Sequence, residues 1–575
     1  MQIKQRRFDQ NVVDDLTAQG INPLMARLYV ARGAMGKQDL ASSLSDIIPP
    51  DQLTNASAMA KLLANGIAAS KKFLVIGDYD ADGATATAVA VKGLKSMGAN
   101  IDFLVPNRFE YGYGLTPEIV ALAATLKPDI LITVDNGIAS VDGVAAANLL
   151  GLQVLITDHH LPAETTPAAA CIVNPNQHGC TFKSKNLAGV GVMFYVLLAL
   201  RAELRNRGAF SESAEPNLTE LLDLVALGTV ADLVKLDTNN RILVEQGLRR
   251  IRAGACCVGI TALLKISGKS PEKVTAQDLG FYVGPRLNAA GRLDDMSLGI
   301  ACLLAETETD AMQKAQALHE LNMERRNIEA DMQDTALISL ENIAVTDKFS
   351  LSIYNADYHQ GVVGILASRL KEKYHRPTIV FADAGQDAKN EHIIKGSGRS
   401  IAGLHLRDAL DLVTKRHPNL IIKFGGHAMA AGLSIRDTDF AAFETAFEDV
   451  ARELLTTADL QALMETDGSL DAKDMSLQTA FILASQVWGQ GFPQPVFSDN
   501  FKVISQRIVG QKHLKLILEK DQKRIDAIYF NCQDSLNTKI HVTYALESNE
   551  YNNLQTVQLV IKHVDVYDET HTGIS

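Results

Sequence analysis

The segment FLVIGDYDADG, Phe73–Gly83, joins a short apolar run directly to three aspartates. The run Phe73–Gly77 predicts a buried β-strand, and the residues after it, Ala84–Met97, predict a helix. The alternation continues with strands predicted at Ile101–Val105, Ile130–Val134 and Val154–Thr157, and with a helix that starts at a proline, Pro117–Leu126. Apolar strands separated by helices are typical of a parallel sheet in an α/β domain.

The rest of the chain has three other patterns. Gly189–Leu236 is helical in pattern, and residues 298–343 predict one or two long connecting helices, although a pair of ordinary surface helices fits equally well. A second α/β body is predicted over Lys348–Leu455, with strands at Leu351–Tyr354 and Thr378–Phe381. Beyond Glu465, strands are predicted at Phe501–Ile504, His513–Leu518, Ile525–Phe530, Lys539–Leu546 and Val557–Val564. Five strands in about 110 residues suit a small barrel such as an OB-fold.

We therefore expect a multidomain α/β protein. It should contain a parallel-sheet catalytic domain, a long helical connector, a smaller second α/β domain and a C-terminal OB-like β-barrel. The expected boundaries are 1–45 for an N-terminal segment, 46–297 for the catalytic domain, 298–343 for the connector, 344–460 for the second domain and 465–575 for the barrel.

Composition limits the class of protein. The net charge of −12 argues against a nucleic-acid partner, unless the acids bind metal ions or the basic residues cluster locally. No run approaches the ~20 apolar residues of a membrane span, and the opening MQIKQRRFDQ lacks the apolar core of a signal peptide. The six cysteines show no metal-binding spacing. These features predict a cytoplasmic protein without a membrane partner.

Three predicted strands end in clusters of acidic and histidine side chains. These side chains are Asp78, Asp80, Asp82, Asp135, Asp158, His159 and His160. Because ligand sites of an open parallel sheet lie beyond the carboxyl ends of its strands, we expect them to converge. Crowded carboxylates repel one another unless a cation binds them, and oxygen ligands with imidazole suit Mg²⁺ or Mn²⁺. We expect two divalent cations about 3.5–4 Å apart, which activate a water and hold a phosphoryl group.

Other interpretations of these motifs are weaker. DYDADG matches the start of a calcium-binding EF-hand loop, but the twelfth position is Val89, where that loop needs a glutamate. A single aspartate at a strand end often only caps the next helix, but three clusters with two histidines make capping alone a poor account. GVGVMF (Gly189–Phe194) has Phe194 where a dinucleotide-binding motif needs its third glycine, so NAD is not expected.

The motifs DYDADG, VDNG and DHH, in this order, resemble the DHH phosphoesterase superfamily, and ALGTVADLVKL resembles its fourth motif. The resemblance implies that two metals are held by Asp80, Asp82, Asp135, His159 and Asp232, with Asp135 as the bridge. It also implies catalytic roles for Asp78, Asp158 and His160: Asp78 as a further ligand or outer acid, Asp158 as the residue that orients the histidines, and His160 as a contact to the scissile phosphate. Which of the two histidines is the ligand stays open.

Within that superfamily, three features resemble the RecJ-type exonucleases. They are GPRLNAAGRLDD (Gly284–Asp295), GGHAMAAGL (Gly425–Leu433) and the C-terminal β segment. The resemblance implies DNA or phosphate contacts from Arg108, Arg286, Asn288, Arg292, Arg399, Ser400, Gly425, Gly426 and His427. Arginine offers a fork for two phosphate oxygens, and glycine lets backbone N–H groups approach, although an ordinary salt bridge fits each arginine alone equally well. His359 is either a phosphate contact or a helix cap.

The predicted barrel carries a local excess of positive charge. Residues 501–530 contain seven Lys or Arg and three Asp or Glu, a local charge of 7 − 3 = +4 in a chain of −12. Tyr529, Phe530 and Tyr544 could stack on bases for about 1–3 kcal/mol each, although aromatic side chains of β segments more often fill a barrel. The basic excess favours a groove that follows a nucleic-acid backbone.

The resemblance implies a metal-dependent exodeoxyribonuclease that is specific for single-stranded DNA. It implies 5′-to-3′ hydrolysis that releases 5′-mononucleotides in recombination and repair, beside a single-stranded DNA-binding protein and a helicase, and we expect a monomer. One alternative is a phosphodiesterase for short oligonucleotides or cyclic dinucleotides, which would not need the barrel. Another is a non-catalytic replication scaffold, which would have lost the metal ligands that this chain retains.

Overall fold

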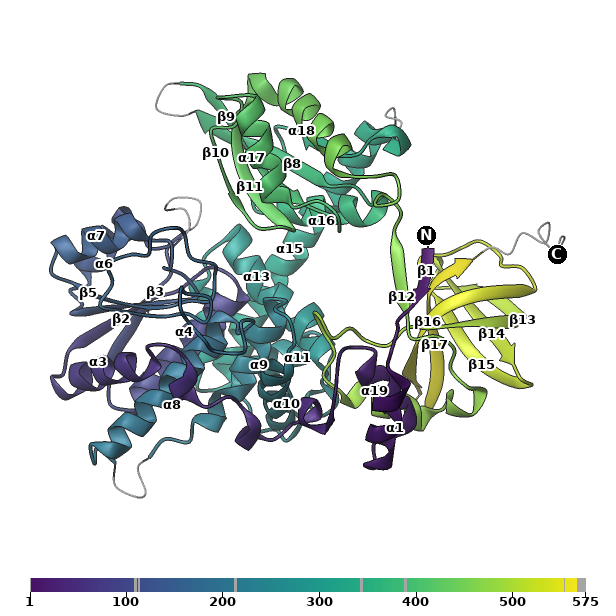
Figure 1. Cartoon of the computed structure of the whole chain (residues 1–575), viewed down its shortest axis with the longest axis horizontal. Coiled ribbons are helices and arrows are strands. Elements are labelled where there is room, and N and C mark those ends of the chain that lie inside the picture. The colour runs from purple at the N-terminus through teal and green to yellow at the C-terminus, as the bar shows by residue number, and fades with distance from the viewer. Residues whose placement is uncertain are drawn as a thin grey trace. The chain divides into compact units, whose positions relative to one another are not determined.

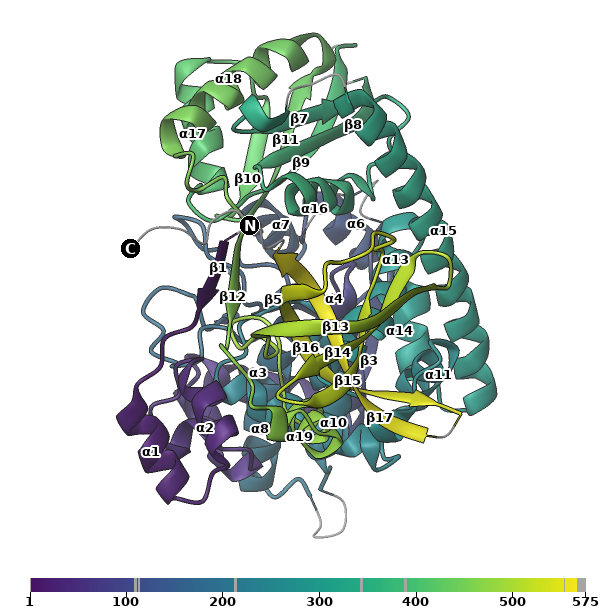
Figure 2. The same cartoon turned by 90° about the vertical axis from the view of Figure 1, so that its right-hand side faces the viewer.

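The computed structural model describes residues 2–107, 111, 114–210, 215–341, 345–386, 390–552 and 554–565. The chain divides into two compact units: Met1–Ile3 with Glu320–Met464, and Lys4–His319 with Glu465–Ser575. The larger unit contains the first α/β domain and the C-terminal barrel, and the smaller contains the second α/β domain (Figure 1). Helix α15 (Glu308–Glu341) runs through both units (Figure 2).

The first domain is built on five parallel strands in the order β3-β2-β4-β5-β6. Their bounds are β2 (Lys72–Ile76), β3 (Asn100–Leu104), β4 (Ile130–Val134), β5 (Gln153–Thr157) and β6 (Cys171–Val173). The first four confirm the predicted strands to within one residue. Strand β6 was not predicted, because three residues at a sheet edge are too short for an apolar pattern to show.

Helices cover both faces of this sheet (Figure 1). Helices α6 (Pro117–Thr125) and α7 (Val141–Leu149) pack on one face, and α3 (Ala56–Ala68), α4 (Ala81–Ser96) and α8 (Gly189–Asn206) lie on the other. Strands β2, β4 and β5 are buried on both faces and read as continuous apolar runs, whereas the edge strand β3 (NIDFL) is partly exposed. Gly66 of α3 allows close packing, since a Cβ there would lie 2.6 Å from the ring of Phe73.

Helix α4 begins three residues before its predicted start. Asp80 is its N-cap, and the carboxylate of Asp80 accepts a hydrogen bond from the backbone N–H of Gly83 at 3.0 Å. Asp82 therefore lies in the first helical turn instead of the preceding loop. The capping interpretation and the metal interpretation of the DYDADG aspartates are thus compatible, because an N-cap uses only one of the two carboxylate oxygens.

The helical stretch after α8 leads to the remaining elements of the first domain. They are α9 (Leu222–Ala231), α10 (Thr238–Arg252), α11 (Val258–Ile266), α12 (Ala276–Asp278), the π-helix η6 (Leu279–Val283), α13 (Gly284–Leu293) and α14 (Ser297–Leu304). Asp232 is the C-cap of α9. The 34 residues of α15 confirm the long connecting helix.

The second domain has a mixed sheet in the order β10-β11-β9-β8-β7. Its strands are β7 (Leu351–Tyr354), β8 (Thr378–Gln386), β9 (His392–Arg399), β10 (Lys423–Gly426) and β11 (Ala430–Arg436). Only β7 and β8 pair in parallel. Helices α17 (Leu406–Arg416) and α18 (Phe440–Leu454) pack around a core that includes Phe381, Phe443 and Phe447, and α16 (Val363–Tyr374) packs in a second core with Val380 and Ala382. The sequence pattern indicated β7 and β8 but not the three glycine-rich or polar strands.

The C-terminal strands form a closed barrel in the order β13-β14-β15-β17-β16. They are β13 (Phe497–Val509), β14 (His513–Lys520), β15 (Lys523–Tyr529), β16 (Lys539–Tyr551) and β17 (Leu554–Asp565), and α19 (Leu477–Ser485) packs against β16. All five predicted strands are confirmed. Tyr544 as a stacking platform is wrong: its ring is buried in the barrel, and its O–H donates to Asp499 at 2.7 Å.

The N-terminal segment, which carries no recognisable motif, attaches to the barrel end of the chain. Strand β1 (Gln2–Gln5) pairs with β12 (Leu463–Thr466), and α1 (Gln10–Ala18) and α2 (Pro23–Val30) follow. After α2, the guanidinium of Arg32 binds both carboxylate oxygens of Asp467 at 2.8 and 2.9 Å, and it lies over the ring of Trp488. Among the described residues, no helix is both long and apolar enough to span a bilayer.

Candidate metal centre and phosphate contacts

The structure brings the predicted acids together at the carboxyl ends of β2, β4 and β5. Three overlapping groups have ligand atoms within 4.8 Å of one another. They are Asp78–Asp80–Asp135, Asp82–His159–Asp232 and Asp135–His159–His160. Nε2 of His159 lies 3.1 Å from a carboxylate oxygen of Asp135 and 3.5 Å from one of Asp232. His159 thus points into the acids, and Asp232 joins them from the end of α9.

Burial and mutual repulsion make these carboxylates strong candidates for cation ligands. Burial, followed by the charge of Asp80, raises the pKa of Asp82 to about 7. Burial and the neighbouring aspartates also raise the pKa values of Asp135 and Asp232 well above their ordinary range. Oδ1 of Asp135 and Oδ2 of Asp232 are buried and accept no hydrogen bond from any described residue. Buried carboxylate oxygens of this kind fit divalent cations. A bound cation would offset both the loss of hydration and the repulsion between the carboxylates.

Asp82 is positioned by the N-terminus of α8. Its carboxylate accepts hydrogen bonds from the backbone N–H groups of Gly189 at 2.6 Å and Val190 at 2.9 Å. A Cβ at Gly189 would lie 2.5 Å from Cβ and Oδ1 of Asp135, so this position requires glycine. The sequence analysis missed this role, although glycine at the start of a predicted helix was its signal. The motif rejected for NAD therefore contributes backbone donors to the acid cluster.

The VDNG motif fixes the backbone of Asp135, the residue expected to bridge the two metals. Asp135 has a φ of +62°, an uncommon conformation for a residue with a side chain. Next to it, the buried amide of Asn136 donates to the carbonyl oxygens of Ile76 at 3.1 Å and Val134 at 2.9 Å. These bonds tie the ends of β2 and β4 together. The strained backbone of Asp135 is thus supported from both strands.

The DHH motif is organised by Asp158. Its Oδ1 accepts hydrogen bonds from Nδ1 of His160 at 2.8 Å and from the backbone N–H of His159 at 2.7 Å, while its Oδ2 accepts from Ile138 at 2.9 Å. Although burial opposes it, the hydrogen bond and charge of Asp158 raise the pKa of His160 to about 9. The same bond outweighs burial and lowers the pKa of Asp158. This bond favours the protonated form of His160.

Two asparagines support the same motif and were not predicted. Asn176 donates to the carbonyl oxygen of His159 at 2.7 Å, and Asn174 donates to that of His160 at 2.9 Å. Asn174 is fully buried. An asparagine carries no distinctive sequence signal, and the strand that precedes Asn174, β6, was not predicted, so only the fold reveals this role.

The α13 residues of the predicted phosphate set lie against the DYDADG loop. Asn288 accepts a hydrogen bond from the backbone N–H of Ala81 at 2.7 Å. Arg286 is 8% exposed and donates to the carbonyl oxygen of Tyr282 and to Nδ1 of His319. Arg292 is partly buried in the last turn of α13. Asn288 and Arg286 thus hold local structure, and Arg108 lies outside the described residues.

The other predicted contacts belong to the smaller unit. Arg399 donates to the hydroxyl of Ser397 and the carbonyl oxygen of Gly398, and burial lowers its pKa. Ser400 is buried and donates to the carbonyl oxygen of Leu404 at 2.8 Å.

The glycine-histidine motif of the smaller unit forms a hairpin. Gly425 and Gly426 end β10, where Gly425 faces open space and Gly426 has a φ of +145°. The backbone N–H of His427 donates to Ala430 in the turn toward β11. Nδ1 of His359 accepts a hydrogen bond from the backbone N–H of Gly361 at 3.1 Å in the turn before α16, whose N-cap is Val362.

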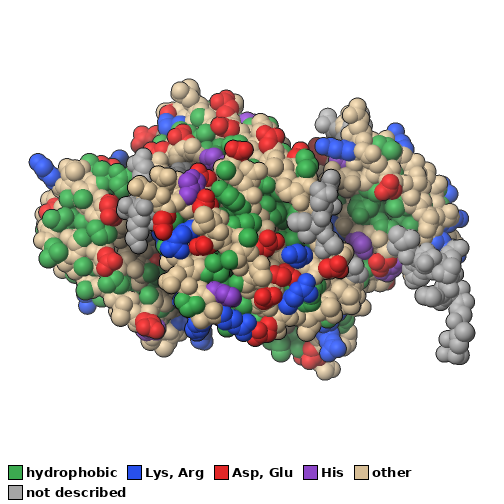
Figure 3. Space-filling model, turned by 90° about the horizontal axis from the view of Figure 1, so that it is seen from above, with side chains coloured by type: hydrophobic (Ala, Val, Ile, Leu, Met, Phe, Trp, Pro, Cys, Tyr) green, Lys and Arg blue, Asp and Glu red, His purple; other side chains and the backbone are tan. Residues whose placement is uncertain are grey.

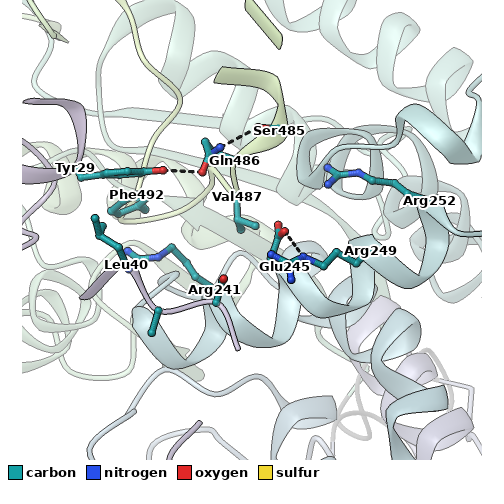
Figure 4. A pocket seen from close by; sticks show the side chains of 12 residues that line it. Tyr29, Leu40, Arg241, Glu245, Arg249, Arg252, Ser485, Gln486, Val487 and Phe492 are labelled. Atoms are coloured by element: carbon teal, nitrogen blue, oxygen red, sulfur yellow. Dashed lines mark hydrogen bonds and ion pairs between the residues drawn. The ribbon is translucent and has the colours of Figure 1, made fainter. Parts of the chain in front are cut away.

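A separate cavity of about 360 Å³ lies between α2, α10 and the loop after α19 (Figure 4). Arg249 pairs with Glu245 there, and Tyr29 donates to Gln486. None of the predicted site residues lines this cavity. On the face drawn in Figure 3, acidic and basic side chains are interspersed with hydrophobic ones instead of gathering by sign.

Comparison with known proteins agrees with this geometry. The N-terminal domain of the DHH family matches residues 72–229, the DHHA1 domain matches 346–456, and the RecJ OB domain matches 466–563. The first match covers β2 through β5 and most of α9, which contribute all of the clustered acids except Asp232. The fold and the acid cluster therefore define a DHH-type protein with a DHHA1 domain and an OB barrel.

Relatives that match along their full length show which family of DHH-type proteins this chain resembles. The single-stranded-DNA-specific exonuclease RecJ of Salmonella typhimurium is 48% identical over 98% of this chain and 99% of its own length. Its Escherichia coli counterpart is 47% identical over the same shares. The crystal structure of RecJ with Mn²⁺ from Thermus thermophilus has 27% identity and a TM-score of 0.82, covering 100% of this chain and 80% of that one. A second structure of that protein contains Mg²⁺. The chain belongs to the RecJ family, as the sequence motifs indicated.

Proposed function

We propose that the protein is a metal-dependent exonuclease that degrades single-stranded DNA from the 5′ end and releases 5′-mononucleotides. The observation that carries this proposal is the buried cluster of Asp82, Asp135, His159 and Asp232 in a chain of the RecJ family. A role in recombination and repair follows from the same membership. The 5′ polarity and the product rest on family resemblance.

Two Mn²⁺ or Mg²⁺ ions would be held by Asp80, Asp82, Asp135, His159 and Asp232, with Asp78 beside them. When bound, such ions supply positive charge for phosphoryl oxygens and lower the pKa of an attacking water. The position of His159 among three carboxylates supports it as the ligand, since Asp158 holds the ring of His160 instead.

His160 is proposed to contact the scissile phosphate. Its imidazolium ring is fixed by Asp158, so it can donate Nε2–H to a phosphoryl oxygen and stabilise the charge that develops there. Asp158 acts as a positioning residue. Arg108, Arg286, Asn288, Arg292, Arg399, Ser400, Gly425, Gly426 and His427 are proposed as contacts to DNA phosphates. Asn288 also accepts a hydrogen bond from the loop that carries the acids.

The barrel is proposed to bind the strand away from the metal centre. Lys502, Arg507 and Lys512 are exposed and form no ion pair within the described residues. The ends of the domains at 45, 297, 343, 460 and 465 remain proposals, as do a monomeric state, a cytoplasmic location, and a single-stranded DNA-binding protein and a helicase as partners.

The test is digestion of 5′-labelled single-stranded and duplex DNA with Mn²⁺, Mg²⁺ or EDTA. We expect labelled mononucleotide from the single strand with either metal and none with EDTA. Asp82→Asn should abolish the release, while Asp142→Asn, an exposed acid on α7, should behave as wild type. Hydrolysis confined to short or cyclic substrates would favour the small phosphodiesterase, and no turnover at all would favour the scaffold.

A further inference from the structure

Two large apolar side chains are exposed on segments that meet at the end of α9, the helix whose C-cap is Asp232. Leu233, which directly follows Asp232, is 68% exposed, and Phe281 in the π-helix η6 is 69% exposed. Folding does not bury either side chain, so neither contributes much to the stability of the core. Single exposed apolar side chains are common on protein surfaces. What distinguishes these two is the backbone conformation of Leu233 and the packing that places η6 against the helix end that carries Asp232.

The backbone at Leu233 strengthens this point. Leu233 follows the C-cap of α9 with a φ of +60°, a left-handed conformation that helix ends usually assign to glycine or asparagine. Leucine is unfavourable there because its Cβ crowds the backbone. A leucine that is strained in its backbone and exposed in its side chain serves neither the helix end nor the core.

The π-helix η6 places Phe281 next to the same helix end. A Cβ at Gly280 would lie 3.1 Å from Cγ1 of Val230, and one at Gly284 would lie 3.2 Å from Cβ of Ala231. These two glycines therefore pack η6 and the start of α13 onto the last turn of α9. Phe281 lies between them in the chain and is exposed instead of packed. Single-turn π-helices are frequent at functional sites.

We propose that Phe281 and Leu233 form an apolar platform on which a nucleobase of the bound strand stacks. The inference rests on the proposed function and specifies how that site recognises its substrate. Every base has an aromatic face, so such a contact is independent of sequence, as an exonuclease requires. Bases of a single strand can turn outward to stack on side chains, whereas those of a duplex are already stacked and paired. The platform therefore contributes to the preference for single strands.

The test measures steady-state kinetics on two single strands, one with all its bases and one that is abasic in the first few nucleotides. We expect Phe281→Ala to raise KM on the normal strand about 5- to 150-fold with little change in kcat. Phe281→Trp should restore KM. Phe481→Ala, at an exposed phenylalanine on α19, should match wild type. On the abasic strand, wild type and Phe281→Ala should have equal KM values.

Leu233→Asn separates recognition from folding. Asparagine tolerates the left-handed conformation, so the melting temperature should stay equal or rise while KM on the normal strand increases. A fall in melting temperature without a change in KM would assign Leu233 a structural role and overturn its part in the platform. Equal losses for Phe281→Ala on normal and abasic strands would overturn the role of Phe281.

Binding is measured separately from cleavage. The result then distinguishes an incorrect platform assignment from an incorrect proposed function. In an Asp82→Asn background, Phe281→Trp should show tryptophan quenching by a normal oligonucleotide and less by the abasic one, because Trp488 is 9% exposed and contributes little. Absence of this difference would overturn the platform. A wild-type protein that binds but never cuts single strands would overturn the proposed function alone.

Discussion

The carboxylates of the metal centre are oriented by backbone groups and histidine. Asp82 accepts two N–H groups of α8, and the ion pairs described for Asp82, Asp135 and Asp232 are all with His159. A lysine or arginine in the cluster would compete with a divalent cation for the same oxygens. The arrangement therefore orients the ligands and preserves their negative charge.

The two histidines should differ when each is replaced. His159→Ala removes an imidazole that lies among three carboxylates, so Mn²⁺ affinity should fall about 10- to 100-fold or more. His160→Ala removes a charge held outside them by Asp158, so kcat should fall about 100-fold with Mn²⁺ affinity nearly unchanged. Calorimetric titration with Mn²⁺ and single-turnover digestion measure the two effects. The opposite pattern would exchange the roles assigned to these residues.

At this scale, sequence predicts side-chain chemistry better than backbone chemistry. Asp80 and Asp135 could be proposed as ligands from sequence because acids that follow several strands of one parallel sheet converge at its edge, whereas the choice between His159 and His160 needed the structure. The N–H donors of Gly189 and Val190 could not, since a backbone group has no residue type. Arg286 was proposed for its phosphate-binding side chain, and the structure adds contacts to Tyr282 and His319 that no sequence motif indicates.

Helix α8 provides the second prediction. Gly189→Ala would place a methyl group 2.5 Å from Oδ1 of Asp135, which must move. Because the backbone N–H of this residue also holds Asp82, we expect Mn²⁺ affinity and kcat/KM to fall at least 10-fold. The circular dichroism spectrum should remain that of wild type.

The matched control is Gly191→Ala on the same helix. A Cβ there meets only the flexible side chain of Leu187, at 3.2 Å. It should keep the wild-type Mn²⁺ affinity. If both substitutions lowered Mn²⁺ affinity equally, the loss would come from alanine anywhere at the start of α8, and not from the contact of residue 189 with Asp135.

The barrel strands provide a third prediction. The triple change Lys502→Ala, Arg507→Ala and Lys512→Ala removes exposed charges without breaking an ion pair between described residues. If each charge contacts one phosphate of a single strand, the slope of log K against log salt concentration should decrease by about 2. Fluorescence anisotropy with a long oligonucleotide measures this slope.

The control for the barrel is Lys473→Ala, a charge outside the barrel strands in the 3₁₀ turn Ala472–Asp474. It should leave the salt dependence as in wild type. An unchanged slope in the triple variant would place the strand on another surface.

The sequence pattern predicted the strands that consist of apolar residues and missed those that are rich in glycine or polar residues. Strands β2, β4 and β5 are buried on both faces, so each shows as an apolar run in the sequence. Strand β9 contains GSGR and β10 contains FGG, which resemble turns by composition. Their strand conformation comes from pairing with β8 and β11, a non-local contact that local pattern does not encode.

At the scale of the whole molecule, removing metal should couple stability to pH. The folded pKa values of Asp82, Asp135, Asp232 and His160 are all raised, with Asp82 at about 7. The folded state therefore binds protons more tightly than the unfolded state. In EDTA, stability should rise as pH falls from about 8 to about 6, and it should be lost as pH rises through these folded pKa values.

Mn²⁺ should reverse that trend, because metal binding requires deprotonated ligands. At a free concentration of 100 times Kd, the added stability is about 2.7 kcal/mol, and it should grow with pH. Differential scanning calorimetry near pH 6 and pH 8, with EDTA or Mn²⁺, compares the four conditions. Asp82→Asn should flatten the pH dependence in EDTA. A melting temperature in EDTA that is higher near pH 8 than near pH 6 would contradict the assignment.

The bond between Arg32 and Asp467 has a consequence for biosynthesis. The two residues are 435 positions apart, and Arg32 is buried against a carboxylate and an indole that the ribosome makes late. At translation rates of 5–20 residues per second, the partner is synthesised roughly 20–90 s after Arg32. During that interval Arg32 and the neighbouring end of α2 lack these partners, so ribosome-bound chains cut short before Asp467 should show this end of α2 more sensitive to protease than the full-length protein.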